Sequence, residues 1–95
     1  MYARVTKYKM KADSVDAAIE IMNNIKDRIL GLPGMIQFVN VMQPDGAGYI
    51  VSIVESQEVS EANNDKVAAL WGAFADHLEG APEPDGGDVV ANWTP

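Results

Sequence analysis

The chain contains no cysteine among its 95 residues and only one histidine. The absence of cysteine excludes disulfides, thiol nucleophiles and thiolate metal sites. With one histidine and scattered carboxylates, no spacing matches a zinc or iron site, so no metal site is expected. No Gly-rich phosphate loop opens a helix, and no sharp turn presents a serine nucleophile. The sequence therefore carries no diagnostic catalytic motif.

Positive charge is also scarce. Seven Lys and Arg stand against fourteen Asp and Glu, giving a net charge of −7. Phosphate backbones and anionic membrane surfaces repel such a chain, so neither nucleic acid nor a membrane is an expected partner. No apolar run approaches the roughly 18 residues of a membrane span, and no leader pattern precedes the first strand. The sequence therefore predicts a cytoplasmic protein.

What the sequence does contain is typical of one globular domain. Hydrophobic residues make up 47% of the chain and charged residues 22%. The length predicts a single domain over residues 1–95. A chain this short buries only a modest share of its surface, so association with a partner would add to its stability.

The first elements are a strand and a helix. Residues 2–10 alternate with a two-residue period, which predicts a strand. Asp13 and Ser14 offer a helix N-cap, and apolar residues recur at helical spacing from there to about Leu30. Gly31 supplies the C-terminal stop of this amphipathic helix.

A hairpin and a second helix follow. Residues 35–43 and 49–55 predict two strands, and the Pro/Gly-rich residues 44–48 predict the turn between them. Ser60 is expected to cap the second helix. The apolar stripe of this helix comprises Val67, Leu70, Trp71, Phe74 and Leu78.

The end of the chain completes the pattern. The acidic Pro/Gly segment around residues 82–88 is expected to be a loop, and a short final strand is expected over residues 88–93. The element order is then β-α-β-β-α-β. This order predicts an α+β, ferredoxin-like domain, in which a four-stranded antiparallel sheet carries two helices on one face.

The hairpin predicts a partner, because both of its faces are apolar. One face of the third strand carries Tyr49, Val51 and Ile53, and the other carries Ile50 and Val54. In the second strand, Ile36, Phe38 and Met42 oppose Met35, Val39 and Val41. Two helices cover one face only, and a solvated second face would alternate with polar residues. A homodimer through the open sheet face is therefore expected, with an oversized apolar pocket as the alternative.

Residues 32–38, LPGMIQF, form a Pro-Gly turn that leads from the first helix into an apolar strand. With the element order, this segment resembles the antibiotic biosynthesis monooxygenase-like group of the dimeric α/β-barrel superfamily. The resemblance implies a homodimer whose sheets face each other, with a pocket between sheet and helices in each subunit. It also implies cofactor-independent oxidation of aromatic substrates in some members, heme breakdown in others, and no assigned activity in many.

The heme-degrading branch of that group uses an Asn on the first strand with a Trp and a His near the second helix. Trp71 and His77 supply two of these residue types, but the first strand has no Asn. The resemblance therefore disfavours heme, and no cofactor is expected.

Three residues of the second helix are candidates for chemistry or binding. His77 is the only side chain whose unperturbed pKa lies near neutrality, so it is the predicted proton acceptor. The alternative is a boundary residue bonded to a backbone carbonyl. Trp71 and Phe74 are expected to be core residues that also line a cavity for a ligand.

Arg4, Thr6 and Tyr8 share one face of the first strand and are the remaining candidates for substrate binding. A strand face with Arg and Tyr is expected either in the dimer interface or beside a pocket. If buried, Arg4 needs a carboxylate, for which Glu55 is a candidate, and an interfacial ion pair is favoured over a role in substrate binding. Asn40 is expected to bond at a bulge or interface. Trp93 is expected to seal the edge of the core.

Two functions remain open from the sequence. The first is a cofactor-independent monooxygenase-like protein that binds a small aromatic or apolar molecule between sheet and helices. The second is a non-enzymatic ligand-binding or structural homodimer, in which Trp71, Phe74 and His77 are only core residues.

Overall fold

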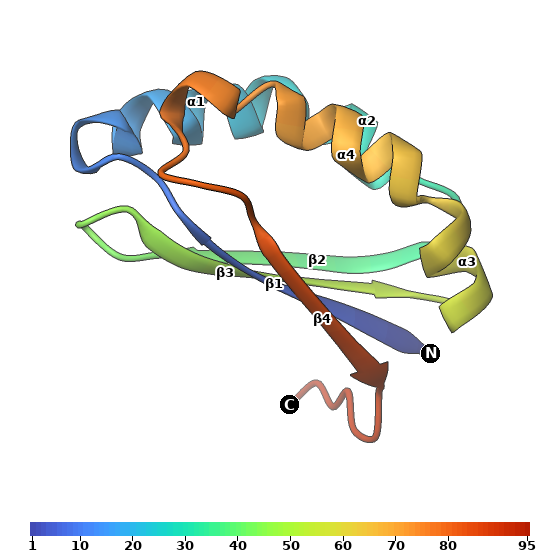
Figure 1. Ribbon diagram of the computed structural model, residues 1–95. Coiled ribbons are helices and arrows are strands. Elements are labelled where there is room, and N and C mark those ends of the chain that lie inside the picture. The colour runs from blue at the N-terminus through green and yellow to red at the C-terminus, as the bar shows by residue number, and fades with distance from the viewer.

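Two layers make up the chain in the computed structural model, which describes residues 1–95: a four-stranded sheet and helices that cover one of its faces (Figure 1). The strands are β1 Tyr2–Lys9, β2 Met35–Met42, β3 Ala47–Val54 and β4 Glu83–Asp88. The helices are α1 Val15–Asn24, α2 Lys26–Leu30, α3 Gln57–Ala62 and α4 Asn64–Gly72, with short 3₁₀ helices η1 Ala12–Ser14 and η2 Ala75–His77. None of the helices is both long and apolar enough to cross a bilayer.

The sheet has the strand order β2-β3-β1-β4, and every neighbouring pair is antiparallel. This confirms the predicted ferredoxin-like architecture and the central place of the first strand. Each predicted helix is divided in two, the first at Ile25 and the second at Asn63. The Asn63 side chain is buried and donates a hydrogen bond to the Pro33 carbonyl (2.9 Å). This bond connects the α3–α4 junction to the turn before β2.

The last strand is not where the sequence pattern predicted it. Residues 83–88 were expected to form a loop, but they are β4, and residues 89–93 are irregular. All six residues of β4 are exposed, so no apolar alternation could mark them as a strand. Pro84 is tolerated because an edge strand needs few ladder donors. The prediction for Trp93 was also wrong, since its side chain is 91% exposed beyond β4.

A bulge alters the predicted faces of β2. The register against β3 shifts between Met35 and Gln37, so one extra residue, Ile36, stands in the strand. Ile36 was placed on the face of Phe38, but the shift instead turns Met35 to that face. Met35 and Phe38 pack against the core cluster, whereas Ile36 is 47% exposed.

The helix caps also differ from the prediction. Ser60 lies inside α3, and Ser56 is the residue that caps it: the Ser56 hydroxyl accepts a hydrogen bond from the Val59 amide (3.2 Å). The apolar stripe begins only in α4, so the polar α3 left no helical periodicity to find. Ser14 precedes α1 as predicted, but its side chain makes no cap hydrogen bond there.

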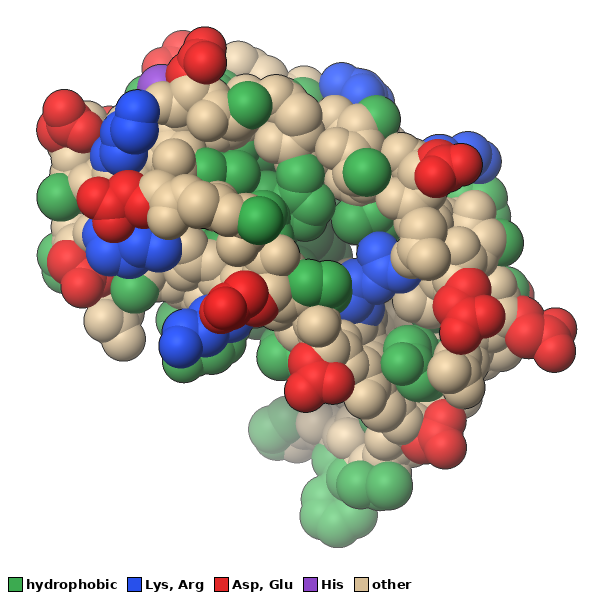
Figure 2. All heavy atoms as spheres, in the orientation of Figure 1, with side chains coloured by type: hydrophobic (Ala, Val, Ile, Leu, Met, Phe, Trp, Pro, Cys, Tyr) green, Lys and Arg blue, Asp and Glu red, His purple; other side chains and the backbone are tan.

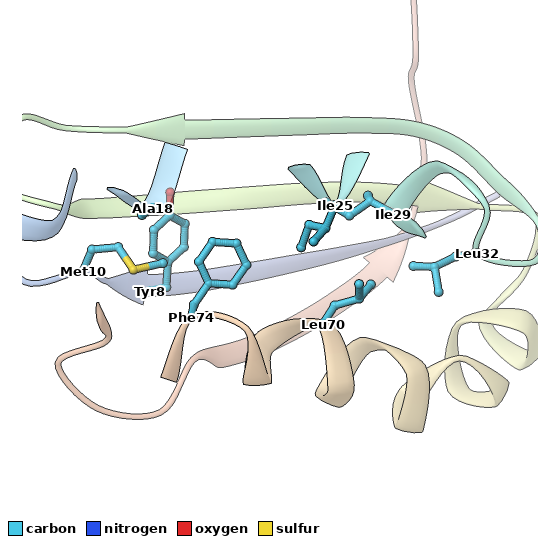
Figure 3. Packing of buried hydrophobic residues seen from close by; sticks show 8 residues of the cluster. All are labelled: Tyr8, Met10, Ala18, Ile25, Ile29, Leu32, Leu70 and Phe74. Atoms are coloured by element: carbon cyan, nitrogen blue, oxygen red, sulfur yellow. The ribbon is translucent and has the colours of Figure 1, made fainter. Parts of the chain in front are cut away.

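The core lies between the sheet and the helices, as Figure 3 shows. Its buried side chains are Tyr8, Met10, Ala18, Ile25, Ile29, Leu32, Leu70 and Phe74. The opposite face of the sheet is left uncovered (Figure 1). Val5, Val39, Val41 and Tyr49 belong to that face by register, and each is more than a third exposed. An apolar second face is therefore present.

Candidate functional site

A cavity of about 640 Å³ lies between the β1–β4 half of the sheet and helices α3 and α4. Figure 2 shows a hollow with hydrophobic side chains in its depth. Its lining comes from four places in the chain: Tyr2, Arg4 and Thr6 of β1; Ser60 and Glu61 of α3; Asn64, Val67, Ala68 and Trp71 of α4; and Pro82, Pro84, Asp85 and Gly86. A volume in the range of about 300–1,000 Å³ is typical of sites for small organic molecules.

A smaller, mostly apolar chamber of about 70 Å³ adjoins this cavity beneath α2 and α4. Ten of its 13 lining residues are hydrophobic. Arg4, Thr6, Val67 and Trp71 line both spaces, so they mark the junction between them. The two spaces together give an outer cavity lined by both polar and apolar groups, with an apolar inner end.

Arg4 projects from the central strand toward the start of α4. Its Nη2 donates hydrogen bonds to the Ser60 carbonyl (2.8 Å), the Ser60 hydroxyl (3.3 Å) and Asn64 Oδ1. The predicted ion pair with Glu55 is wrong, because the only ion pair within 4.0 Å is Lys9–Glu79 (3.4 Å). Neutral oxygen atoms at the α3–α4 junction take the place of the expected carboxylate. They hold the guanidinium in position and leave its charge uncompensated.

Tyr8 lies behind the cavity wall and lines neither space. Its hydroxyl donates to Asn40 Oδ1 (2.6 Å), and Asn40 Nδ2 donates to Met22 Sδ (3.0 Å). Asn40 is therefore bonded within the chain, at neither a bulge nor an interface. Burial raises the pKa of the Tyr8 phenol, and the hydrogen bond to Asn40 partly offsets this shift.

Trp71 packs against two other aromatic rings, those of Tyr8 and Phe74. The Tyr8 and Trp71 ring centroids lie 5.6 Å apart, and those of Trp71 and Phe74 lie 5.8 Å apart in an edge-on arrangement. These separations are within the range of favourable aromatic pairs. Trp71 forms part of the wall of both spaces, whereas Phe74 is 9% exposed and reaches only the inner chamber. Trp71 thus packs against both Tyr8 and Phe74 and also borders both spaces.

His77 lies apart from both spaces. It ends η2, after α4 has stopped at Gly72, and its Nδ1 is 3.0 Å from the Ser14 hydroxyl. The His77 carbonyl accepts a hydrogen bond from the Lys11 amide (2.8 Å). The cavity therefore offers no imidazole to a heme iron, and the residues present do not fit that group. The proton-acceptor role of His77 stays a prediction.

Sequence reasoning missed much of the cavity wall. Tyr2 could have been found, since it shares the predicted face of Arg4 and Thr6. Glu61 and Asp85 carried no signal, because α3 has no apolar stripe and the residues of β4 show no strand pattern. No three His, Cys, Asp or Glu side chains are grouped as metal ligands would be.

No protein-family model matches the chain, and no curated protein matches it in sequence. Solved structures match it over almost its whole length. A protein described as "Putative antibiotic biosynthesis monooxygenase from Nitrosomonas europaea" superposes with a TM-score of 0.79 at 14% identity, covering 96% of this chain and 100% of that one. One with the same description from Caulobacter crescentus gives 0.77 at 15%, covering 95% and 90%.

A third structure, described as NE2512 protein of unknown function from Nitrosomonas europaea, gives a TM-score of 0.78 at 15% identity, covering 99% of this chain and 93% of that one. At such identities the matches establish a shared fold. The resemblance drawn from residues 32–38 and the element order is thereby confirmed for the fold. The matching proteins include one of unknown function, so the fold alone names no substrate.

Proposed function

We propose that the chain binds a small aromatic molecule between the sheet and helix α4 and oxidises it with dioxygen, without a metal or an organic cofactor. The observation that carries the proposal is the wall formed by Trp71, packed against Tyr8 and Phe74, at the junction of the outer cavity and the apolar chamber. Such a wall suits a flat ring, and its apolar surroundings exclude water from one side of the bound ring.

The chemistry needs a substrate that supplies its own electrons. A phenol or quinol loses a proton, and the resulting anion reduces dioxygen. One oxygen atom of the resulting hydroperoxide stays on the ring carbon, which loses its hydrogen as a proton while the O–O bond breaks. The other oxygen leaves as water, and the substrate, having supplied all four electrons, becomes the quinone. The chain contributes the apolar surface and a proton acceptor.

Two kinds of acceptor are proposed. His77 is the candidate from the sequence, although its side chain bonds Ser14 outside the cavity. The carboxylate of Glu61 is the candidate from the geometry, because Glu61 lines the outer cavity, whereas Asp85 pairs with Val5 and so directs its side chain to the open sheet face. Glu61→Gln and His77→Ala variants separate these roles, since only loss of the true acceptor lowers turnover while leaving binding intact.

The binding test uses Trp71 as its reporter. The chain has two tryptophans, and Trp93 is exposed far from the core. A Trp93→Phe variant therefore leaves Trp71 as the sole indole, and a quinol bound at the wall should quench its fluorescence. Oxygen uptake with the same quinol then measures turnover. Absence of any quenching by a panel of one- to three-ring quinols would contradict binding at this wall.

The second candidate function is a ligand-binding protein without turnover. The position of His77, outside both spaces, favours it. Saturable quenching of Trp71 with no oxygen uptake, in the parent and in both acceptor variants, would support this function over oxidation.

The open sheet face is the proposed homodimer interface. Val5, Val39, Val41 and Tyr49 form an apolar surface that a second copy of the same face would bury. Light scattering should report twice the monomer mass of 10.3 kDa at micromolar concentration. A species of monomer mass across that range would refute the dimer and leave the cavity proposal untouched.

A further inference from the structure

We infer that the ligand of this cavity carries a single carboxylate, which pairs with Arg4 while the aromatic part rests against Trp71. The inference rests on the proposed binding function and adds the class of ligand: a monoanionic aromatic carboxylate.

Arg4 is the only basic residue among those that line the two spaces. It is also an unpaired cation in a chain of net charge −7, since no carboxylate lies within 4.0 Å of its guanidinium. A half-buried charge without a counter-ion costs free energy that an anion in the cavity would recover. Among the basic residues Arg4 alone lines both spaces, and its position at the junction gives it access to whatever occupies the cavity.

The hydrogen bonds of Arg4 leave donors free. All three of its bonds fall on Nη2, and no protein acceptor engages the N–H groups on Nε or Nη1. No buried side-chain polar atom of the chain lacks a partner, so these free donors are reached by solvent or ligand. Guanidinium N–H groups bind carboxylate oxygens strongly because both partners are charged. The clamp at Ser60 and Asn64 fixes the guanidinium before a ligand arrives.

The other charges of the cavity limit the ligand to one negative charge. Glu61 is exposed and lines the outer cavity, so a second carboxylate lying away from Arg4 would meet like charge. The apolar lining, from Val67, Trp71, Pro82 and Pro84, suits the ring system. The geometry therefore favours a ligand whose carboxylate lies at the junction, beside Arg4, and whose ring system is flat and uncharged.

The test compares 2-naphthoate with 2-naphthamide, which has nearly the same shape and no charge. Isothermal titration calorimetry of the full chain should show naphthoate binding about 10- to 100-fold more tightly, the range expected for a hydrogen-bonded charge pair. The dicarboxylate 2,6-naphthalenedicarboxylate should bind more weakly than naphthoate. In Arg4→Gln, naphthoate should fall to the affinity of naphthamide, and naphthamide should be unchanged.

Arg4 also bonds Ser60 and Asn64, so Arg4→Gln can lose folding as well as charge. Asn64→Asp provides the matched variant. It keeps Arg4 and its acceptor, places a carboxylate beside the guanidinium, and suits the first residue of α4, where the helix dipole favours an acid. The preference of Asn64→Asp for naphthoate over naphthamide should drop at least about tenfold below that of the parent chain.

The outcomes separate this inference from the function on which it rests. Equal affinity of the parent for naphthoate and naphthamide, or an undiminished preference in Asn64→Asp, would contradict a carboxylate ligand paired with Arg4. Either result is compatible with aromatic binding in the cavity. Binding of neither compound, together with no quenching of Trp71 by quinols, overturns both. A naphthoate preference that disappears in Asn64→Asp supports the role of Arg4.

Discussion

Gly48 of β3 lies directly beneath the buried ring of Tyr8, and its replacement by alanine tests the packing behind the cavity. A Cβ atom built at Gly48 would lie 2.5 Å from the Val41 carbonyl oxygen and even closer to the Tyr8 hydroxyl and ring. Neither neighbour can yield easily. The carbonyl is backbone within β2, and Tyr8 is 4% exposed and bonded to Asn40.

The magnitude follows from two losses. Overpacking of a filled site costs about 1–3 kcal/mol. Displacing the Tyr8 hydroxyl from Asn40 costs about 1 kcal/mol more. Gly48→Ala should therefore lower the free energy of unfolding by about 2–4 kcal/mol, a large share of the roughly 5–15 kcal/mol available to a natural domain. At about 4–8 °C per kcal/mol, the Tm should fall by at least about 8 °C.

Gly72→Ala is the control, because it makes the same chemical change with nothing within 4 Å of the new Cβ. Gly72 ends α4, so alanine should raise stability by up to about 1 kcal/mol. Urea and thermal unfolding of both variants, followed by circular dichroism at one protein concentration, measures the contrast. If Gly48→Ala loses less than about 0.5 kcal/mol, a value typical of unconstrained sites, the packing described around Tyr8 is incorrect.

Three further predictions address other parts of the chain. Burial raises the pKa of Tyr8, so the stability tied to its protonated form is complete below about pH 10, the pKa of an unfolded tyrosine, and is lost as the pH rises through the folded pKa. Urea midpoints from about pH 8 to 11 should fall at the alkaline end, and Tyr8→Phe should remove that part of the fall. Ser56→Ala removes the hydroxyl that caps α3 and should cost about 1 kcal/mol in the same urea assay, whereas Ser56→Asp should not. Val41→Lys places a charge on the open sheet face, so light scattering should report a monomer; a dimer that persists would exclude this face as the interface.

The architecture could be predicted from the sequence because it rests on burial. Strands β1, β2 and β3 end within two residues of their predicted limits, since each alternates side chains between a core and an opposite face. The second helix could be placed by its apolar stripe, but its start could not, because the residues of α3 are mostly polar.

The candidate site was only partly predictable. Arg4, Thr6 and Trp71 were identified because a strand face and a helix stripe aim them at the same layer. β4 could not be foreseen, because a strand with six exposed residues follows no hydrophobic pattern and is specified by pairing with β1 alone. The acceptor of the Arg4 hydrogen bond could not be predicted either, because it is the backbone carbonyl of Ser60, and a backbone carbonyl has no sequence signature.

The exposed strand β4 has a consequence for the rates of ligand exchange. It forms one wall of the cavity, yet only β1 pairs with it, and its sequence includes Pro84 and two glycines. Such an edge opens at a small fraction of the free energy that global unfolding requires. A ligand can therefore enter and leave past this edge while the other three strands stay folded. Once bound, a ligand that touches this wall holds it closed, so slowed amide hydrogen exchange confined to β4 would report occupancy even for a ligand that undergoes no reaction.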